Sequence, residues 1–208
     1  MSKEKYNNIV KHYENCLDKF GDTHKGVDWP NEEDALKRYK VMMDVIREQV
    51  DEILLLDFGC GAGHLLEYIE KKGIKNIKYS GLDLSEKFTE LCRKKFPDQE
   101  FITADILENP GDVPASDYVI MNGVFTEKRE LSYDEMFEYF KEMLRAIFPK
   151  VNKGLAFNVM SKIVDWERDD LFHLSFDAAG EFLARDLSRN FVIRNDYGLY
   201  EYTVYLYK

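Results

Sequence analysis

The 208-residue sequence contains few cysteines, and their spacing matches neither a disulfide framework nor a metal site. Cys16, Cys60 and Cys92 are odd in number and far apart, with no CxxC pair and no cluster of metal ligands around them. This usage favours a reducing, cytoplasmic environment, and we expect no bound metal. The polar N-terminus lacks the apolar core of a signal peptide. No stretch reaches the roughly 18 apolar residues of a membrane span.

Positive charge is scarcer than negative charge, with 29 Lys and Arg against 39 Asp and Glu and a formal net charge of -10. This balance counts against unspecific nucleic-acid binding, because phosphate contacts need clustered Lys and Arg. The basic run 93–95 is expected on a solvated helix face. The chain contains no repeat, low-complexity run or linker, and its length fits one domain with a substantial core. We expect neither a nucleic-acid nor a membrane partner, and a monomer or homodimer.

The most informative stretch is the glycine-rich segment 57–63, Asp-Phe-Gly-Cys-Gly-Ala-Gly. It follows the apolar run 53–56, which is typical of a parallel strand covered on both faces. A helical pattern begins at Leu65. Alternating glycines let the backbone turn tightly and let a ligand approach without Cβ clashes. The stretch therefore predicts a strand, a ligand-binding loop and a helix N-terminus; a tight turn with no ligand is the alternative.

The glycine spacing distinguishes between two kinds of cofactor. A dinucleotide fingerprint, GxGxxG, needs its third glycine where this chain has His64. Asp57 would repel a pyrophosphate but attract an ammonium group such as that of S-adenosylmethionine. The pattern D-x-G-x-G-x-G resembles the first motif of the class I S-adenosylmethionine-dependent methyltransferases. That resemblance implies S-adenosylmethionine as cofactor, S-adenosylhomocysteine as product, and a cradle for the methionine end formed by Asp57, Gly59, Cys60, Gly61 and Gly63, with Cys60 packing rather than reacting.

Two further acids follow predicted strands at positions where this family binds adenosine. Asp83 ends the strand 79–83, where an acid can accept hydrogen bonds from both ribose hydroxyls. The next residue, Leu84, would then pack on the adenine. In the family an acid after the third strand accepts a hydrogen bond from the adenine amino group, which implies that role for Asp105 beside Ile106. A turn-forming Asp in a surface loop is the alternative for Asp105.

Residues 1–50 precede the first strand and are expected to form two amphipathic helices, the second reaching to about residue 50. In the family, a segment in this place packs beside the cofactor and closes over the substrate. The string His24-x-Gly26-x-x-Trp29, followed by Arg38-Tyr39, looks like a pattern of small bacterial members. It implies that Arg38 binds the methionine carboxylate and that Trp29 covers the cofactor or substrate. A hydrophobic staple at Trp29 and a solvated Arg38 are the alternatives.

The fourth predicted strand, 117–122, ends where ligands of open α/β sheets bind. Asn122 is therefore expected at the cofactor, and Phe125 and Thr126 near the methyl group and the acceptor. This loop lacks the Asn/Asp-Pro-Pro-aromatic sequence of enzymes that methylate base amino groups or glutamine, and the Pro-Cys of those that methylate cytosine carbon. Trp166, in the charged insertion 160–174, is expected in the substrate wall.

The remaining pattern predicts a helix over 132–148, a strand over 154–159, a helix over 177–187 and a terminal hairpin of 191–195 and 200–207. Such a hairpin adds one antiparallel strand to an otherwise parallel sheet. The resemblance implies an α/β fold: a Rossmann-like, doubly wound, seven-stranded sheet of order 3-2-1-4-5-7-6 with strand 7 antiparallel. In this prediction residues 1–50 form an N-terminal helical cap, and residues 51–208 form the methyltransferase domain.

The resemblance implies methyl transfer from S-adenosylmethionine to an O or N atom of a small molecule. Candidate acceptors are a sugar, a sugar nucleotide or a carboxylate of surface-glycan or secondary metabolism. Because a sulfonium is intrinsically reactive, the protein mainly has to align the reacting atoms. A general base is needed only for a hydroxyl or a protonated amine, and the candidates are His24 and Tyr13, followed by His12 and His173. The alternatives are a protein or RNA acceptor and a non-catalytic S-adenosylmethionine-binding scaffold.

Overall fold

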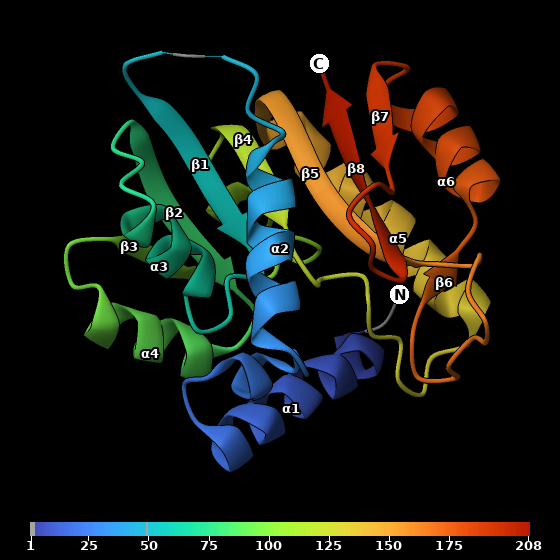
Figure 1. The fold of residues 1–208 in the computed structure, drawn as a ribbon, viewed down its shortest axis with the longest axis horizontal. Coiled ribbons are helices and arrows are strands. Elements are labelled where there is room, and N and C mark those ends of the chain that lie inside the picture. The colour runs from blue at the N-terminus through green and yellow to red at the C-terminus, as the bar shows by residue number, and fades with distance from the viewer. Residues whose placement is uncertain (1–2, 49) are drawn as a thin grey trace.

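The computed structural model describes residues 3–48 and 50–208, and a twisted sheet forms its centre (Figure 1). The main strands lie in the order β3-β2-β1-β4-β5-β8-β7 and are parallel except for β8, which runs antiparallel to β5 and β7. This is the predicted order and the predicted antiparallel strand, so the expected fold is confirmed. The strands are β1 (Ile53–Phe58), β2 (Ile77–Asp83), β3 (Glu100–Thr103), β4 (Ser116–Met121), β5 (Val151–Ser161), β7 (Phe191–Arg194) and β8 (Glu201–Tyr207).

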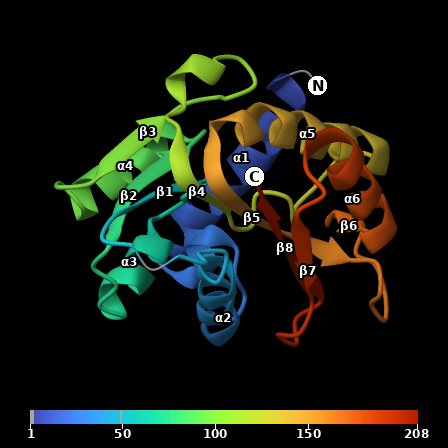
Figure 2. The same cartoon turned by 90° about the horizontal axis from the view of Figure 1, so that it is seen from above.

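Helices cover both faces of the sheet, as the view from above shows (Figure 2). On one face, α5 (Tyr133–Ile147) and α6 (Phe176–Phe182), which continues as a π-helical turn over Leu183–Leu187, enclose the larger core. On the other face, α2 (Glu32–Met43) and α3 (His64–Lys71) enclose the second core. The helix α4 (Glu86–Lys95) joins β2 to β3. Burial of both faces explains why β1 is a continuous apolar run rather than an alternating one.

Side-chain caps fix where several of these helices begin. Ser132 and Glu135 form a reciprocal capping box at the start of α5. The hydroxyl of Ser85 accepts from the Phe88 amide at the start of α4, and Ser175 caps α6 in the same way. Each cap satisfies a backbone N–H that the helix itself leaves unpaired.

Two local predictions were wrong. The second N-terminal helix ends at Met43 and does not reach residue 50. Tyrosines of β8 explain this end, because the Tyr205 hydroxyl donates to the Val41 carbonyl and the Tyr207 hydroxyl donates to the Val45 carbonyl. The insertion 160–174, expected to be irregular, contains the two-residue strand β6 (His173–Leu174), which pairs in parallel with the end of β5.

The first helix, α1 (Lys3–Phe20), lies across the edge at which the parallel strands β1 and β2 end (Figure 1). A short 3-10 helix, η1 (His24–Val27), follows it and leads to Trp29 and α2. Side chains of α1 contact the sheet edge directly: the Tyr6 hydroxyl donates to Asp105 at 2.6 Å. This placement makes α1 the roof of the space above the strand ends. No described helix is long and apolar enough to cross a membrane.

A buried ion pair attaches α2 to the sheet. The Nε of Arg38 lies 2.9 Å from both carboxylate oxygens of Glu201 on β8, and their side chains are 12% and 1% exposed. Asn158 of β5 extends the network: its Nδ2 donates to Glu201 at 3.1 Å, and its Oδ1 accepts from the Gly123 amide at 2.7 Å. The network therefore joins α2, β8, β5 and the loop after β4.

Replacing Arg38 with Met should destabilise the protein strongly, because it leaves the Glu201 carboxylate buried without its cation. We expect a loss of about 3–5 kcal/mol in the free energy of unfolding, measured by urea denaturation. Burial raises the pKa of Glu201, so the folded state holds that proton more tightly than the unfolded chain. The deficit should therefore be smaller at pH 5 and grow as the pH rises to 8.

The double variant Arg38→Met with Glu201→Met is the control for this experiment, since it removes both charges and keeps similar volume. Most of the stability should return, and its pH dependence should be weaker than that of the single variant. An Arg38→Met protein as stable as the wild type at pH 8 would contradict the role given to this pair.

Candidate functional site

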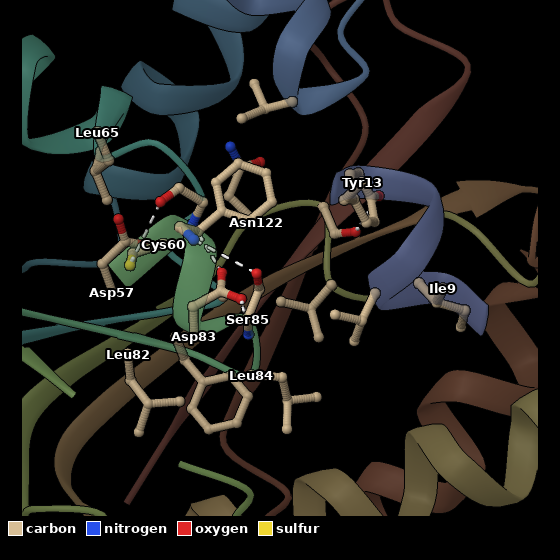
Figure 3. Close-up of a pocket in the computed structure, with 18 of the residues that line it drawn as sticks. Ile9, Tyr13, Asp57, Cys60, Leu65, Leu82, Asp83, Leu84, Ser85 and Asn122 are labelled. Carbon is tan, nitrogen blue, oxygen red and sulfur yellow. Dashed lines mark hydrogen bonds between the residues drawn. The ribbon is translucent and has the colours of Figure 1, made fainter. Parts of the chain in front are cut away.

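A cleft opens at the carboxyl edge of the sheet, between the loops after β1, β2 and β4 and the roof formed by α1 (Figure 3). The strand-end loops contribute polar groups and backbone, and α1 and the segment before α2 contribute mainly aromatic and aliphatic groups. Of the residues predicted for the site, the cleft is lined by Tyr13, Trp29, Asp57, Gly59, Cys60, Gly61, Asp83, Leu84 and Asn122. The tertiary structure thus brings together nine predicted residues from five segments of the chain.

The glycine loop adopts backbone angles that favour glycine. Gly59, Gly61 and Gly63 have φ angles of 77°, 51° and 76°, all in the left-handed region. A Cβ at Gly59 would lie 2.7 Å from a methyl carbon of Val124, so a side chain there would also collide with the opposite loop. Gly63 is the N-cap of α3 and lies just behind the cleft lining. The loop therefore keeps an open backbone surface on the cleft.

The carboxylate of Asp83, at the end of β2, binds the backbone of two neighbouring loops. One of its carboxylate oxygens accepts from the Gly61 amide and the other from the Ser85 amide, each at 2.9 Å. A carboxylate has about four acceptor positions, so both oxygens keep capacity for a ligand hydroxyl. Burial is the main cause that raises the pKa of Asp83. Beside it, the hydroxyl of Ser85 donates to Glu14 of α1, a carboxylate that no sequence motif places here.

Asp57 ends β1 in a buried position where its charge is poorly compensated. Its Oδ2 accepts from the Tyr79 hydroxyl at 2.8 Å. Burial, supported by the nearby Asp83 carboxylate, raises the pKa of Asp57 to about 7 against the opposing effect of Tyr79. A cation in the cleft would stabilise the ionised form, whereas a phosphate would be repelled. The electrostatics at this end of the cleft fit an ammonium group.

Asp105 does not line the cleft, contrary to the expectation for an adenine-binding acid. It lies behind Tyr6, whose hydroxyl it binds, while its other oxygen accepts from the Leu107 amide at 3.0 Å. Tyr6 stacks on Tyr139 of α5 with ring centroids 5.3 Å apart, and both rings line the cleft. Ile106 is buried in the larger core. No local sequence pattern marks either tyrosine as a site residue, although Tyr6 belongs to the apolar face of α1.

Trp29 and Arg38 form one unit at the opposite side of the cleft. The indole lines the cleft and packs against the backbone of Gly123. The guanidinium of Arg38, which is not part of the lining, lies 4.2 Å from the centre of the Trp29 ring. Its Nη1 is buried and has no hydrogen-bond partner among the described residues. Asn122, in the lining, has a buried Oδ1 that is likewise unpartnered within the described part of the chain.

Only one of the two predicted catalytic residues reaches the cleft. Tyr13 of α1 lines it, and its hydroxyl donates to the Gly123 carbonyl at 3.4 Å. Burial raises the pKa of Tyr13, so the group is a neutral hydrogen-bond donor. His24 lies in η1, outside the cleft lining, in a separate depression that it shares with Tyr39 and His64. His173 also lies outside the cleft lining, and its Nδ1 contacts the Ser161 carbonyl at 2.6 Å.

The three predicted substrate residues lie outside the cleft lining. Phe125 is fully buried in the larger core, edge-to-face against Phe140 at 4.9 Å and Phe157 at 5.9 Å. The hydroxyl of Thr126 is used locally, donating to the Gly123 carbonyl at 3.0 Å. Gly123 has a φ angle of 82°, which turns the chain inward after β4. Trp166 is 73% exposed on the insertion.

Comparisons with known proteins agree with this geometry. Residues 55–150 match the family described as "Methyltransferase domain". A Mycobacterium tuberculosis protein, "Putative methyltransferase Rv1506c", is 27% identical over 163 residues, which cover 76% of this chain and 95% of that protein.

Solved structures with the same fold include the magnesium protoporphyrin IX methyltransferase of Synechocystis PCC 6803 with bound SAM. It has a TM-score of 0.63 at 16% identity, and the match covers 97% of this chain and 96% of that one. The plantazolicin methyltransferase BpumL has a TM-score of 0.60 at 16% identity, over 97% of this chain and 89% of that one. The family match and the structures with the same fold are both of methyltransferases, and the cleft lies at the strand ends where open α/β sheets bind ligands.

Truncating Phe125 should test whether this side chain belongs to the core or to a substrate site. Because the ring is fully buried among other aromatic rings, Phe125→Ala should lower the free energy of unfolding by about 3–5 kcal/mol. Trp166→Ala, at an exposed position, should change it by less than about 0.5 kcal/mol. Urea denaturation of both variants measures the difference. Equal stabilities for the two variants would contradict the core assignment.

Proposed function

We propose that this chain, which has the fold and the family signature of a class I S-adenosylmethionine-dependent methyltransferase, transfers a methyl group from S-adenosylmethionine to an O or N atom of a small molecule. When bound, the cofactor supplies a methyl group on a positively charged sulfur. The observation that carries the proposal is the pair of acids at adjacent strand ends, the buried Asp57 and the partly buried Asp83, beside the open glycine loop. Both acids and the loop face the cleft.

The residues of the cleft fit the parts of the cofactor. Asp83 keeps acceptor capacity for ribose hydroxyls, and Leu84 offers an apolar surface for the adenine. Asp57 attracts the ammonium group. The unpartnered Oδ1 of Asn122 is a further acceptor at the cleft wall.

Trp29 and Arg38 complete the methionine end in this proposal. The buried Nη1 of Arg38 lacks a partner within the described chain, which is costly for a charged group unless a ligand supplies one. A carboxylate is the matched partner of a guanidinium. Since Arg38 lies outside the cleft lining and against the indole of Trp29, we expect the indole to move when the carboxylate binds.

The roof over the cleft favours a small acceptor. α1 lies across the strand ends, and its residues Ile9, Val10 and Tyr13 line the cleft from above. A sugar, a sugar nucleotide or a carboxylate of surface-glycan or secondary metabolism would fit beneath this roof. The formal net charge of -10 counts against RNA as the acceptor. In this proposal Tyr13 orients the acceptor by donating a hydrogen bond, and a base is needed only for a hydroxyl or a protonated amine.

Two alternatives remain open to experiment. A protein or RNA acceptor would require α1 to lift from the sheet edge. A non-catalytic S-adenosylmethionine-binding scaffold would bind the cofactor but release no S-adenosylhomocysteine. Incubating the protein with S-adenosylmethionine and either a metabolite panel or cell-derived protein and RNA distinguishes them. We expect S-adenosylhomocysteine release with the metabolite panel above a no-acceptor control. Release with macromolecules alone, or no release at all, would refute the small-molecule proposal.

The cysteine usage adds the expectation that the protein is cytoplasmic.

Removing the Asp83 carboxylate should weaken cofactor binding. Asp83→Ala should lower the affinity for S-adenosylmethionine roughly 10- to 100-fold, because hydrogen bonds to a charged acceptor are lost. Isothermal titration calorimetry measures this change. Asp117→Ala is the matched control, because Asp117 also accepts a backbone hydrogen bond, from Leu54, but at the opposite edge of the sheet. Unchanged affinity in a folded Asp83→Ala variant would refute the assignment.

Cofactor affinity should also depend on pH through Asp57. The free protein holds a proton on this carboxyl below about pH 7, and binding an ammonium group favours the ionised form. The affinity for S-adenosylmethionine should therefore rise roughly tenfold or more between pH 5.5 and 7.5. Asp57→Asn should abolish this rise. Methylthioadenosine, which lacks the amino-acid end, should bind equally at both pH values; a parallel rise for this ligand would contradict the role of Asp57.

A further inference from the structure

Three potential metal ligands meet beside the cleft, although the sequence predicted no metal. His12 and Cys16 lie one turn apart on α1, so both side chains share one helix face. Asp28 comes from the end of η1, on the far side of the turn at residues 21–26. The Nε2 of His12 lies 2.7 Å from Oδ2 of Asp28 and 3.8 Å from Sγ of Cys16. The three ligand atoms all lie within 4.8 Å of one another.

These separations are close to those of a tetrahedral zinc site. Zinc bonds of about 2.0 Å to nitrogen and oxygen and about 2.3 Å to sulfur place neighbouring ligand atoms roughly 3.3–3.6 Å apart. The nitrogen and sulfur are already near that spacing. The nitrogen and oxygen, now joined by a hydrogen bond, would need to separate by less than about 1 Å. Rotation of partly exposed side chains can provide this movement without a change in the backbone, since His12 and Asp28 are 20% and 36% exposed.

The charges around the cluster suit a divalent cation. Besides Asp28, the buried carboxylate of Glu127 interacts electrostatically with both His12 and Asp28. Arg129 faces the same region, and its guanidinium pairs with Glu127 at 3.2 Å and with Asp170 at 3.5 Å. The cation of Arg129 is thus shared between two acids outside the cluster. Asp28 holds a left-handed backbone, with φ 59°, which directs its carboxylate back toward α1.

We propose that His12, Cys16 and Asp28 form a site for a borderline-soft divalent cation, with Zn²⁺ as the best-matched ion. Imidazole and thiolate ligands select zinc over the hard cations Mg²⁺ and Ca²⁺. Three protein ligands leave a fourth position open to water or another donor. The ion ties α1 to the segment that carries Trp29 and so holds the roof of the cleft in place. This inference rests on the cluster alone and is independent of the methyltransferase proposal.

Cobalt substitution tests the site directly, because Co²⁺ bound by a thiolate gives a ligand-to-metal absorption band that Zn²⁺ lacks. We expect chelator-treated full-length protein to bind one Co²⁺ with such a band, and Zn²⁺ to displace it. Cys16→Ser should abolish the band, and His12→Gln or Asp28→Asn should weaken metal affinity at least about tenfold. Thermal melting without metal establishes that each variant is folded.

Two matched controls separate this cluster from similar features elsewhere. His64→Gln removes a second His–Asp pair, in which His64 Nε2 lies 2.9 Å from Asp22, and it should leave the band unchanged. Cys92→Ser removes a buried thiol and should also have no effect. Absence of a thiolate band in the folded wild-type protein, or persistence of the band in Cys16→Ser, would refute the proposal.

A measurement on the unmodified sequence covers the case in which a variant does not fold. Zn²⁺ should protect Cys16 from alkylation by iodoacetamide, measured by mass spectrometry of peptides from the wild-type protein. It should also raise the melting temperature, because the ion binds the folded state. Alkylation of Cys16 at the same rate with and without Zn²⁺ would contradict the site.

Discussion

A pair of carboxylates at the ends of adjacent strands, one buried and one partly buried, is the constraint on which the site depends. Asp57 and Asp83 are held by neutral donors, a tyrosine hydroxyl for one and two backbone amides for the other. Neutral donors satisfy the oxygens without cancelling the charge, so the cleft keeps a negative potential. The Gly61 amide that binds Asp83 belongs to the glycine loop, and the shape of the loop therefore depends on this acid. Asp83 therefore both fixes the shape of the glycine loop and contributes negative charge to the cleft.

The segments that close the cleft are attached to the sheet both by apolar packing and by directional polar contacts. Apolar residues of α2 belong to the second core, and apolar residues of α1 belong to the larger core. α2 is held through Arg38, Glu201 and Asn158, and this network ends on the amide of Gly123 at the cleft wall. α1 is held through the Tyr6–Asp105 and Tyr13–Gly123 hydrogen bonds. Contacts of this kind are specific in direction but can exchange with a ligand or with water.

Local patterns and the family resemblance accounted for the fold and for the residues that the strand-end loops contribute to the cleft. The run before Asp57, the glycine spacing and the acid at position 83 all act within one strand–loop–helix unit or its neighbour, where geometry follows from a few residues. The acceptor side was less predictable. Phe125 and Thr126 are next to Asn122 in sequence, but Gly123 turns the chain and sends them into the core. Asp105 has the expected position after β3, yet Tyr6, about 100 residues away in sequence, covers it.

Local sequence patterns predicted the strand, loop and helix around the glycine segment, the terminal hairpin and the acids that follow β1 and β2, because hydrophobic periodicity and glycine spacing act over short distances. The strand order followed from the family resemblance. Which side chains meet across long separations depends on tertiary packing. Glu201 neutralises Arg38, Tyr6 and Tyr139 line the cleft, and His12, Cys16 and Asp28 meet beside it. No local pattern marks such groups, since their neighbours are set by how α1 and α2 pack on the sheet. The glycine loop and its acids could be predicted from the sequence. The position of the roof above them depends on how α1 and α2 pack on the sheet.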